Sequence, residues 1–207
     1  MKIIPISVEL LDIPTEPIYA YRRIEEAGRT CYKSENKNND VKLTESFIRG
    51  LIKSGHTSVL EHLSISFRIV CDRGTSHQLV RHRHIAVSQQ STRYVSSESG
   101  IEVIKPLSLC EGTPAYDIWV DSIKSSEKGY ANLMKCDMVD KDLARAVLPL
   151  CTKTELVITT NAREWRQIIK QRSSSHAHEN IRLVANMLLA ELCKYYPVVF
   201  EDLKKGD

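Results

Sequence analysis

The strongest constraint on the fold is a run of alternating side chains between residues 63 and 72. Polar residues alternate there with Leu63, Ile65, Phe67, Ile69 and Cys71. Only Val70 breaks the pattern. A period of two predicts a β-strand with one apolar face and one polar face.

Shorter signals predict the remaining elements. Lys2 to Leu10 and Glu155 to Thr160 are β-branched enough for strands. Caps and helical spacing predict seven helices. In the first half of the chain they run from Ile18 to Tyr32, from a Thr44 cap to Gly55, and from a Thr75 or Ser76 cap through His77 to about His82. In the second half, one helix starts at Thr113-Pro114, a short one follows an Asp140 cap and carries Arg145, and two more span Ala162 to Arg172, behind Asn161, and His176 to Tyr195. The polar segment between the helix that ends near His82 and Gly100 is expected to be irregular. Since strands and helices mix without a regular βαβ repeat, we expect an α+β fold, with an antiparallel or mixed sheet packed with helices in a single domain over residues 1–207.

Length and composition indicate which class of protein and which cellular compartment to expect. A chain of 207 residues can bury a core without disulfides or metals. It has no apolar run of the ~18 residues that a membrane span requires and no signal peptide, so we expect a cytoplasmic protein that binds no membrane. Six dispersed cysteines without a CxxC pair predict free thiols.

The segment from Gln78 to Tyr94 concentrates the polar chemistry of the chain. It holds three arginines, two histidines and three glutamines, with few apolar residues. Arginine forks suit phosphates, whereas amides and hydroxyls can recognise a base or a sugar. The segment therefore favours an anionic ligand, either nucleic acid or a phosphorylated small molecule. A solvated surface turn is the alternative. His82 and His84, two apart, would point to opposite faces of a strand, so we expect no metal site.

Motifs spread along the chain narrow these alternatives. They are Gly55-His56-Thr57-Ser58 with Glu61-His62, Arg81-His82-Arg83 followed by Ser91, Arg93 and Tyr94, Ala144-Arg145 with Val147-Leu148-Pro149, Asn161-Ala162-Arg163, and Arg172 with Ser175-His176-Ala177. In this order the motifs resemble the signature of the flavin-dependent thymidylate synthases. Nearly the whole chain is covered by the resemblance.

The resemblance implies the residues of two binding sites. Residues implied to line an FAD site are His56, Ser58, Arg81, His82, Arg83, Gln89, Asn161, Arg163 and Gln167. Residues implied to bind dUMP are Gln78, Arg81, Gln89, Gln90, Ser91, Thr92, Arg93, Arg145 and Arg172. Arg172 is implied to be catalytic, because the family's arginine at this place favours ionisation of the uracil ring. The chain differs from many members at Cys31, Ser88, Gln89 and Gln167.

The resemblance also implies the reaction and the assembly. NADPH would reduce FAD, methylenetetrahydrofolate would supply the methylene group, and the hydride from reduced flavin would complete the conversion of dUMP to dTMP. A homotetramer would hold FAD at its subunit interfaces, without nucleic acid as a partner.

Two other classes of protein stay open at this point. A nucleic-acid-binding module would use Arg81, Arg83 and Arg93 for phosphates. A non-catalytic flavoprotein would keep the fold without turnover. Cys151 follows Pro149-Leu150 but lacks the Pro-Cys-His pattern of the cysteine-dependent thymidylate synthases. It is expected to be a buried small hydrophobe.

Overall fold

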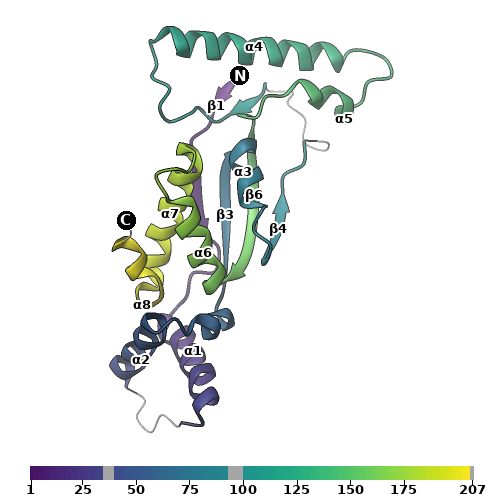
Figure 1. Ribbon diagram of the computed structural model, residues 1–207. Coiled ribbons are helices and arrows are strands. Elements are labelled where there is room, and N and C mark those ends of the chain that lie inside the picture. The colour runs from purple at the N-terminus through teal and green to yellow at the C-terminus, as the bar shows by residue number, and fades with distance from the viewer. Residues whose placement is uncertain (35–39, 93–99, 206–207) are drawn as a thin grey trace.

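In the part of the chain that the structure describes, the strands form two sheets (Figure 1). The computed structural model describes residues 1–34, 40–92 and 100–205. Its main sheet is antiparallel, with the order β2 (Ser7–Leu10), β3 (Ser64–Asp72), β6 (Lys153–Asn161) and β4 (Ile85–Gln89). A small parallel sheet pairs β1 (Lys2–Ile3) with β5 (Glu102–Val103). The strands and the helices around them confirm the predicted α+β class.

Strand β3 shows why the alternating pattern constrained the fold. Phe67 lies opposite Ile158 of β6, and both are buried on the face covered by helices. The ring of Phe67 meets Trp165 edge-on, with centroids 5.1 Å apart. Arg68 points to the other face and pairs there with acidic side chains of the neighbouring strands. One face of the sheet therefore belongs to the core, and the other is polar.

The helices lie on one face and at both ends of the main sheet (Figure 1). Their bounds are α1 (Pro17–Tyr32), α2 (Val41–Lys53), α3 (Arg73–Leu79), α4 (Pro114–Leu133), α5 (Lys141–Ala144), α6 (Ala162–Arg172), α7 (Glu179–Tyr195) and α8 (Pro197–Phe200). The 3-10 helices are η1 (Thr57–His62), η2 (Arg145–Val147) and η3 (Glu201–Lys205). Helices α6 and α7 cover the apolar face, α1 and α2 lie at one end, and α4 crosses the other end.

Three predicted helix starts are confirmed. The side chain of Asn161 accepts from the backbone N–H of Glu164 and begins α6 at the predicted residue. Thr113 caps α4 in the same way. Asp140 caps α5, although that helix ends at Ala144 and leaves Arg145 in the following 3-10 turn.

Other predicted caps were wrong, and in each case an earlier acidic residue caps the helix. Asp40, not Thr44, caps α2. Thr44 instead lies inside the helix and donates to the buried Glu25 over 2.6 Å. Asp72 caps α3 by accepting from the N–H and hydroxyl of Thr75. Because a carboxylate accepts helix-terminal N–H groups well, the helices begin before the predicted hydroxyl residues.

Three strand or helix bounds also differ from the prediction. The opening segment forms two strands in different sheets, separated around Pro5. The expected irregular segment contains β4, an edge strand paired with β6. The last helix begins at Glu179 behind a His178 cap instead of at His176. Helix α3 ends at Leu79 and not near His82 as predicted, so His82 and His84 lie between α3 and β4, outside any strand.

The described ranges contain neither a membrane-spanning helix nor a cluster of metal ligands. No helix there is both long and apolar enough to cross a bilayer. No three His, Cys, Asp or Glu side chains in those ranges gather closely enough to hold a metal ion. All six cysteines are free thiols.

Candidate active site

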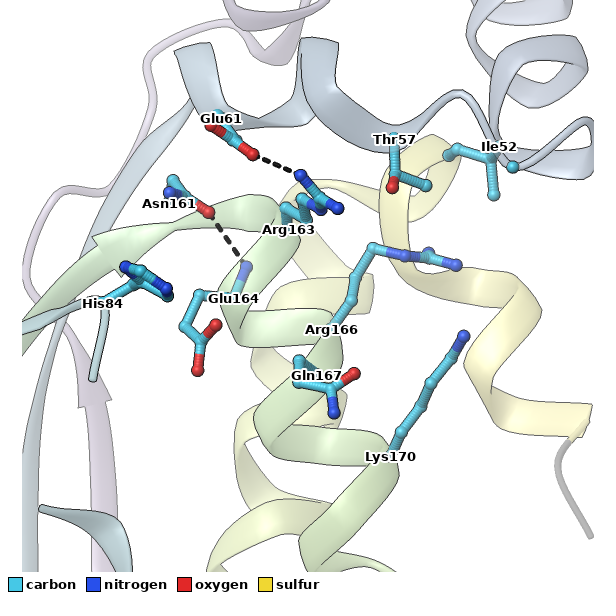
Figure 2. A pocket seen from close by; sticks show the side chains of 11 residues that line it. Ile52, Thr57, Glu61, His84, Asn161, Arg163, Glu164, Arg166, Gln167 and Lys170 are labelled. Atoms are coloured by element: carbon cyan, nitrogen blue, oxygen red, sulfur yellow. Dashed lines mark hydrogen bonds and ion pairs between the residues drawn. The ribbon is translucent and has the colours of Figure 1, made fainter. Parts of the chain in front are cut away.

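A cavity of about 580 Å³ opens at the N-terminal end of α6. Asn161, Arg163 and Gln167 line it, and all three were predicted to contact FAD. Figure 2 shows Arg163 and Gln167 projecting from α6, with the Asn161 cap between the strand and the helix. A helix N-terminus and a nearby guanidinium both favour anions, so the cavity suits a phosphorylated ligand.

The same cavity includes residues that the sequence analysis had not placed in a site. Glu61 forms an ion pair with Arg163 across it. His84 and Lys170 also line it. Lys170 follows Gln167 by three residues on one helix, so helical spacing could have placed both on one face. Arg166 reaches the cavity wall but pairs with Asp202 at 2.6 Å.

A second cavity of about 320 Å³ adjoins the first. His56 and Ser58 line it, as predicted FAD-site residues, together with Cys31. The two cavities share Gly55, Thr57 and Arg163 in their walls. The predicted FAD residues from η1 and α6 therefore lie around one continuous region.

The other end of α6 carries the predicted catalytic arginine. Arg172 Nε donates to His82 Nε2 over 3.2 Å, and its Nη2 donates to the backbone oxygen of Gln78 over 3.0 Å. His82 is buried, and its Nδ1 lies 3.2 Å from Glu164 Oε1. Burial and the Arg172 charge lower the pKa of His82 below its ordinary value, while Glu164 acts in the opposite direction.

Glu164 departs from the expected capping box. Its backbone N–H donates to Asn161 Oδ1 over 2.9 Å, which is the expected half of the motif. Its side chain reaches His82 from α6. The spacing Asn161 to Glu164 thus predicted the helix start but gave no signal for the contact with His82.

The predicted dUMP residues after Ser88 form a group along β4 and the turn after it. Gln89 donates to the hydroxyls of Ser76 and Thr154 over 3.0 and 3.1 Å. Lys153 donates to Gln90 over 3.4 Å. Arg145 approaches this group and donates to Thr92 over 3.3 Å. Ser91 lies half-buried between Gln90 and Thr92.

Part of the predicted site is not brought together within one chain. Arg81 and Arg83 are exposed on the turn before β4. Neither they nor Gln89 line the two cavities around Arg163, as far as the described residues define those walls. Arg93 lies outside the described residues.

The chain is similar to proteins of known family. A family model described as thymidylate synthase complementing protein matches residues 18–198. A flavin-dependent thymidylate synthase of Mycolicibacterium vanbaalenii is 34% identical over 230 residues, covering 98% of this chain and 92% of the relative. Another, from Mycobacterium sp. strain JLS, is 37% identical over 201 residues, covering 87% and 79%.

A solved structure supports the fold. The UMP/dUMP methylase PolB of Streptomyces cacaoi, solved with 5-Br dUMP, superposes with a TM-score of 0.82 at 24% identity, covering 99% of this chain and 97% of the other. At that identity the superposition supports the architecture alone. The family model and the relatives carry the assignment further, and they show that the chain belongs to the flavin-dependent thymidylate synthase family.

Proposed function

We propose that the protein is a flavin-dependent thymidylate synthase that methylates dUMP to dTMP with FAD as its cofactor. The observation that carries the proposal is the arrangement on α6. Arg163 and the helix N-terminus line a cavity suited to an anion, while Arg172 is held at the other end by His82 and Gln78. The resemblance to the family implies that the cofactor and the substrate bind at these two places.

The residues around Arg163 fit FAD by their chemistry. Asn161 and Gln167 offer amides, Arg163 offers a fork for phosphate, and His56 and Ser58 extend the wall into the second cavity. Arg81, His82, Arg83 and Gln89 complete the proposed FAD set. Bound there, FAD supplies the hydride that side chains cannot store.

The residues around β4 would hold dUMP. Arginines suit its phosphate, while amides and hydroxyls suit the sugar and the base. The proposed set is Gln78, Arg81, Gln89, Gln90, Ser91, Thr92, Arg93, Arg145 and Arg172. Arg172 would face the uracil ring, where a fixed guanidinium stabilises a developing anion better than a neutral base. That stabilisation makes C5 nucleophilic enough to accept the methylene group.

The separation of the FAD residues supports a shared site. Arg81 and Arg83 are exposed and do not line the cavities around Arg163, as far as the described residues define those walls. Subunits of a homotetramer would bring one chain's turn to another chain's cavity. Light scattering of the FAD-loaded protein should then give about four times the 23.6 kDa chain mass. A fully active monomer would exclude the shared site.

The remaining components follow the family. Methylenetetrahydrofolate would donate the one-carbon unit, and NADPH would reduce FAD. We place the enzyme in the cytoplasm, with neither nucleic acid nor membrane as a partner.

An absorption spectrum with an FAD titration, followed by an assay of hydrogen release from C5 of dUMP, tests the proposal. We expect a yellow protein that binds FAD at micromolar concentration and forms dTMP. A colourless protein whose affinity for nucleic acid falls steeply with salt would favour the nucleic-acid module. A yellow protein without dTMP formation would favour the non-catalytic flavoprotein.

A further inference from the structure

The imidazole of His82 connects two side chains of α6. Glu164 lies in the first turn of the helix and Arg172 is its last residue, about 12 Å apart along the axis. Both reach the same ring, Glu164 at Nδ1 and Arg172 at Nε2, each over 3.2 Å. His82 is only 8% exposed, so these contacts define its hydrogen bonding.

The donors and acceptors in this chain of contacts fix the tautomer of His82. A guanidinium has only N–H donors, so His82 Nε2 must offer its lone pair to Arg172. The proton of a neutral imidazole then lies on Nδ1, where the Glu164 carboxylate accepts it. Protonating the ring would remove the acceptor at Nε2 and place two cations against each other.

We propose that Glu164 is a positioning residue for Arg172 and acts through His82. Its carboxylate holds the tautomer whose Nε2 accepts from Arg172, and this bond fixes the plane of the guanidinium. The inference rests on the proposed function only in assigning Arg172 to the uracil ring. Because Glu164 and Arg172 occupy the side chain of His82, FAD would contact the main chain of His82 and the exposed side chains of Arg81 and Arg83.

Positioning matters here because an arginine side chain is long and rotatable. The bonds to His82 and to the oxygen of Gln78 hold Nε and Nη2 of Arg172. Within residues 1–34, 40–92 and 100–205, no hydrogen bond engages Nη1. Donors held in place before the reaction stabilise a developing charge without reorganising. A loose Arg172 would keep its charge and lose this advantage.

Among the residues that the structure describes, two charged groups face the His82 ring, and both come from α6. Glu164 favours the protonated ring, whereas Arg172 and burial favour the neutral one. The flanking Arg81 and Arg83 are exposed. Glu164 therefore has two separable effects on His82, since its oxygen orients the proton and its charge stabilises the imidazolium.

Two substitutions of Glu164 separate these effects. Glu164→Leu removes the acceptor, and turnover should fall by about tenfold, as when a partner that orients a functional side chain is removed elsewhere. Glu164→Gln keeps an oxygen for Nδ1–H and should restore most of the turnover. Its lost charge should move the acid limb of the pH–rate profile to lower pH.

The control is Glu191→Gln, which removes a carboxylate from a surface ion pair on α7. It should match the wild type in turnover and pH profile. FAD titration of each variant shows whether the cofactor site is intact. Equal losses in Glu164→Leu and Glu164→Gln, or full turnover in FAD-loaded Glu164→Leu, would overturn the positioning role.

A double-mutant cycle tests whether the effect passes through Arg172. In an Arg172→Ala background, measured by single turnover, Glu164→Leu should cause little further loss. An undiminished tenfold loss in that background would contradict the inference.

The tautomer itself gives a readout that does not need activity. Imidazole ¹⁵N shifts of histidine-labelled protein, assigned with His82→Gln, should show the Nδ1–H form in the wild type and its loss in Glu164→Leu. An Nε2–H form in the wild type would exclude the proposal. A wild-type protein that forms no dTMP would instead refute the proposed function and leave this measurement standing.

Discussion

The arginines at the two ends of α6 differ in their exposure and in the groups that hold them. At the N-terminal end, the Arg163 side chain is 53% exposed and pairs with Glu61, which is 48% exposed. At the C-terminal end, Arg172 is half-buried and bonds to a buried histidine and a backbone oxygen. The same residue type is therefore loosely held at one end and fixed at the other.

This difference indicates a division of labour. Exposed ion pairs contribute about 0 to 1 kcal/mol, so Arg163 can exchange Glu61 for a ligand phosphate at little cost. Partly desolvated hydrogen-bonded groups resist such exchange and keep their geometry. Arg163 is suited to binding, and Arg172 is suited to stabilising charge during a reaction.

Removing Arg172 gives the largest effect expected from this comparison. Arg172→Ala should keep the fold and FAD binding but lower turnover by about a hundredfold or more, as removal of one charge-stabilising donor does elsewhere. Arg172→Lys should rescue little, because an ammonium does not reproduce the planar fork. Steady-state assays of dTMP formation measure the turnover of both variants. Circular dichroism and FAD titration on the same samples show whether the fold and the cofactor binding are kept.

A contrary result would reassign the activating group. Near-normal turnover in folded, FAD-loaded Arg172→Ala would show that another residue activates the ring. Arg93 would be the next residue to test.

A substitution at the N-terminal end of α6 should change the affinity of the protein for FAD. Arg163→Ala removes a charged hydrogen-bond donor, a change that costs about 1.5 to 3 kcal/mol of binding elsewhere. The FAD concentration for half-saturation should therefore rise by at least about tenfold. Fluorescence titration measures it, with Lys194→Ala on α7 as the control for loss of a surface cation. Unchanged FAD affinity in Arg163→Ala would remove this end from the cofactor site.

The same division explains how far the sequence could predict the molecule. Helix α6 was predicted to the residue because Asn161 caps it locally and apolar spacing continues through it. Strand β3 followed from its alternation. Strand β4 was not predicted, because it is an edge strand with mostly exposed residues and its partner β6 lies far along the chain.

Long-range contacts also limited the prediction of the site. The motif Arg81-His82-Arg83 indicated an anion site, yet the fold separates its members by burying His82 and exposing both arginines. No local pattern predicts that Glu164, 82 residues away, meets His82. The caps at Asp72 and Asp40 were missed because hydroxyl residues a few positions later looked equally suitable.

The buried histidine should make stability depend on pH in one direction. The pKa of His82 is lower in the folded protein than its ordinary 6.5, so the unfolded chain binds more protons between the two values. The free energy of unfolding should fall as pH drops below about 6.5, with a slope of at most about 1.4 kcal/mol per pH unit from this group. Urea denaturation across this range measures the slope.

Two histidine variants sharpen this test. His82→Gln removes the titrating group and should flatten the dependence. His84→Gln changes an exposed neighbour and should leave it as in the wild type. A slope that survives in His82→Gln would assign the dependence to other residues.

The smallest effect is expected at Cys151, where neither end of α6 is involved. Cys151 lines a cavity of about 290 Å³ together with Gln78, so its position alone leaves a role as nucleophile open. The chemistry argues against that role, because burial raises the pKa of the Cys151 thiol and the thiolate is the nucleophile. The thiol also packs in a small apolar cluster with Trp119. Cys151→Ser should therefore keep turnover within about a factor of two once the protein is folded and FAD-loaded, and Cys136→Ser, at an exposed thiol, is the matched control. Loss of dTMP formation in Cys151→Ser alone would restore a mechanism in which a thiolate attacks uracil C6, and it would shift the centre of the reaction from Arg172 toward the cavity at Gln78.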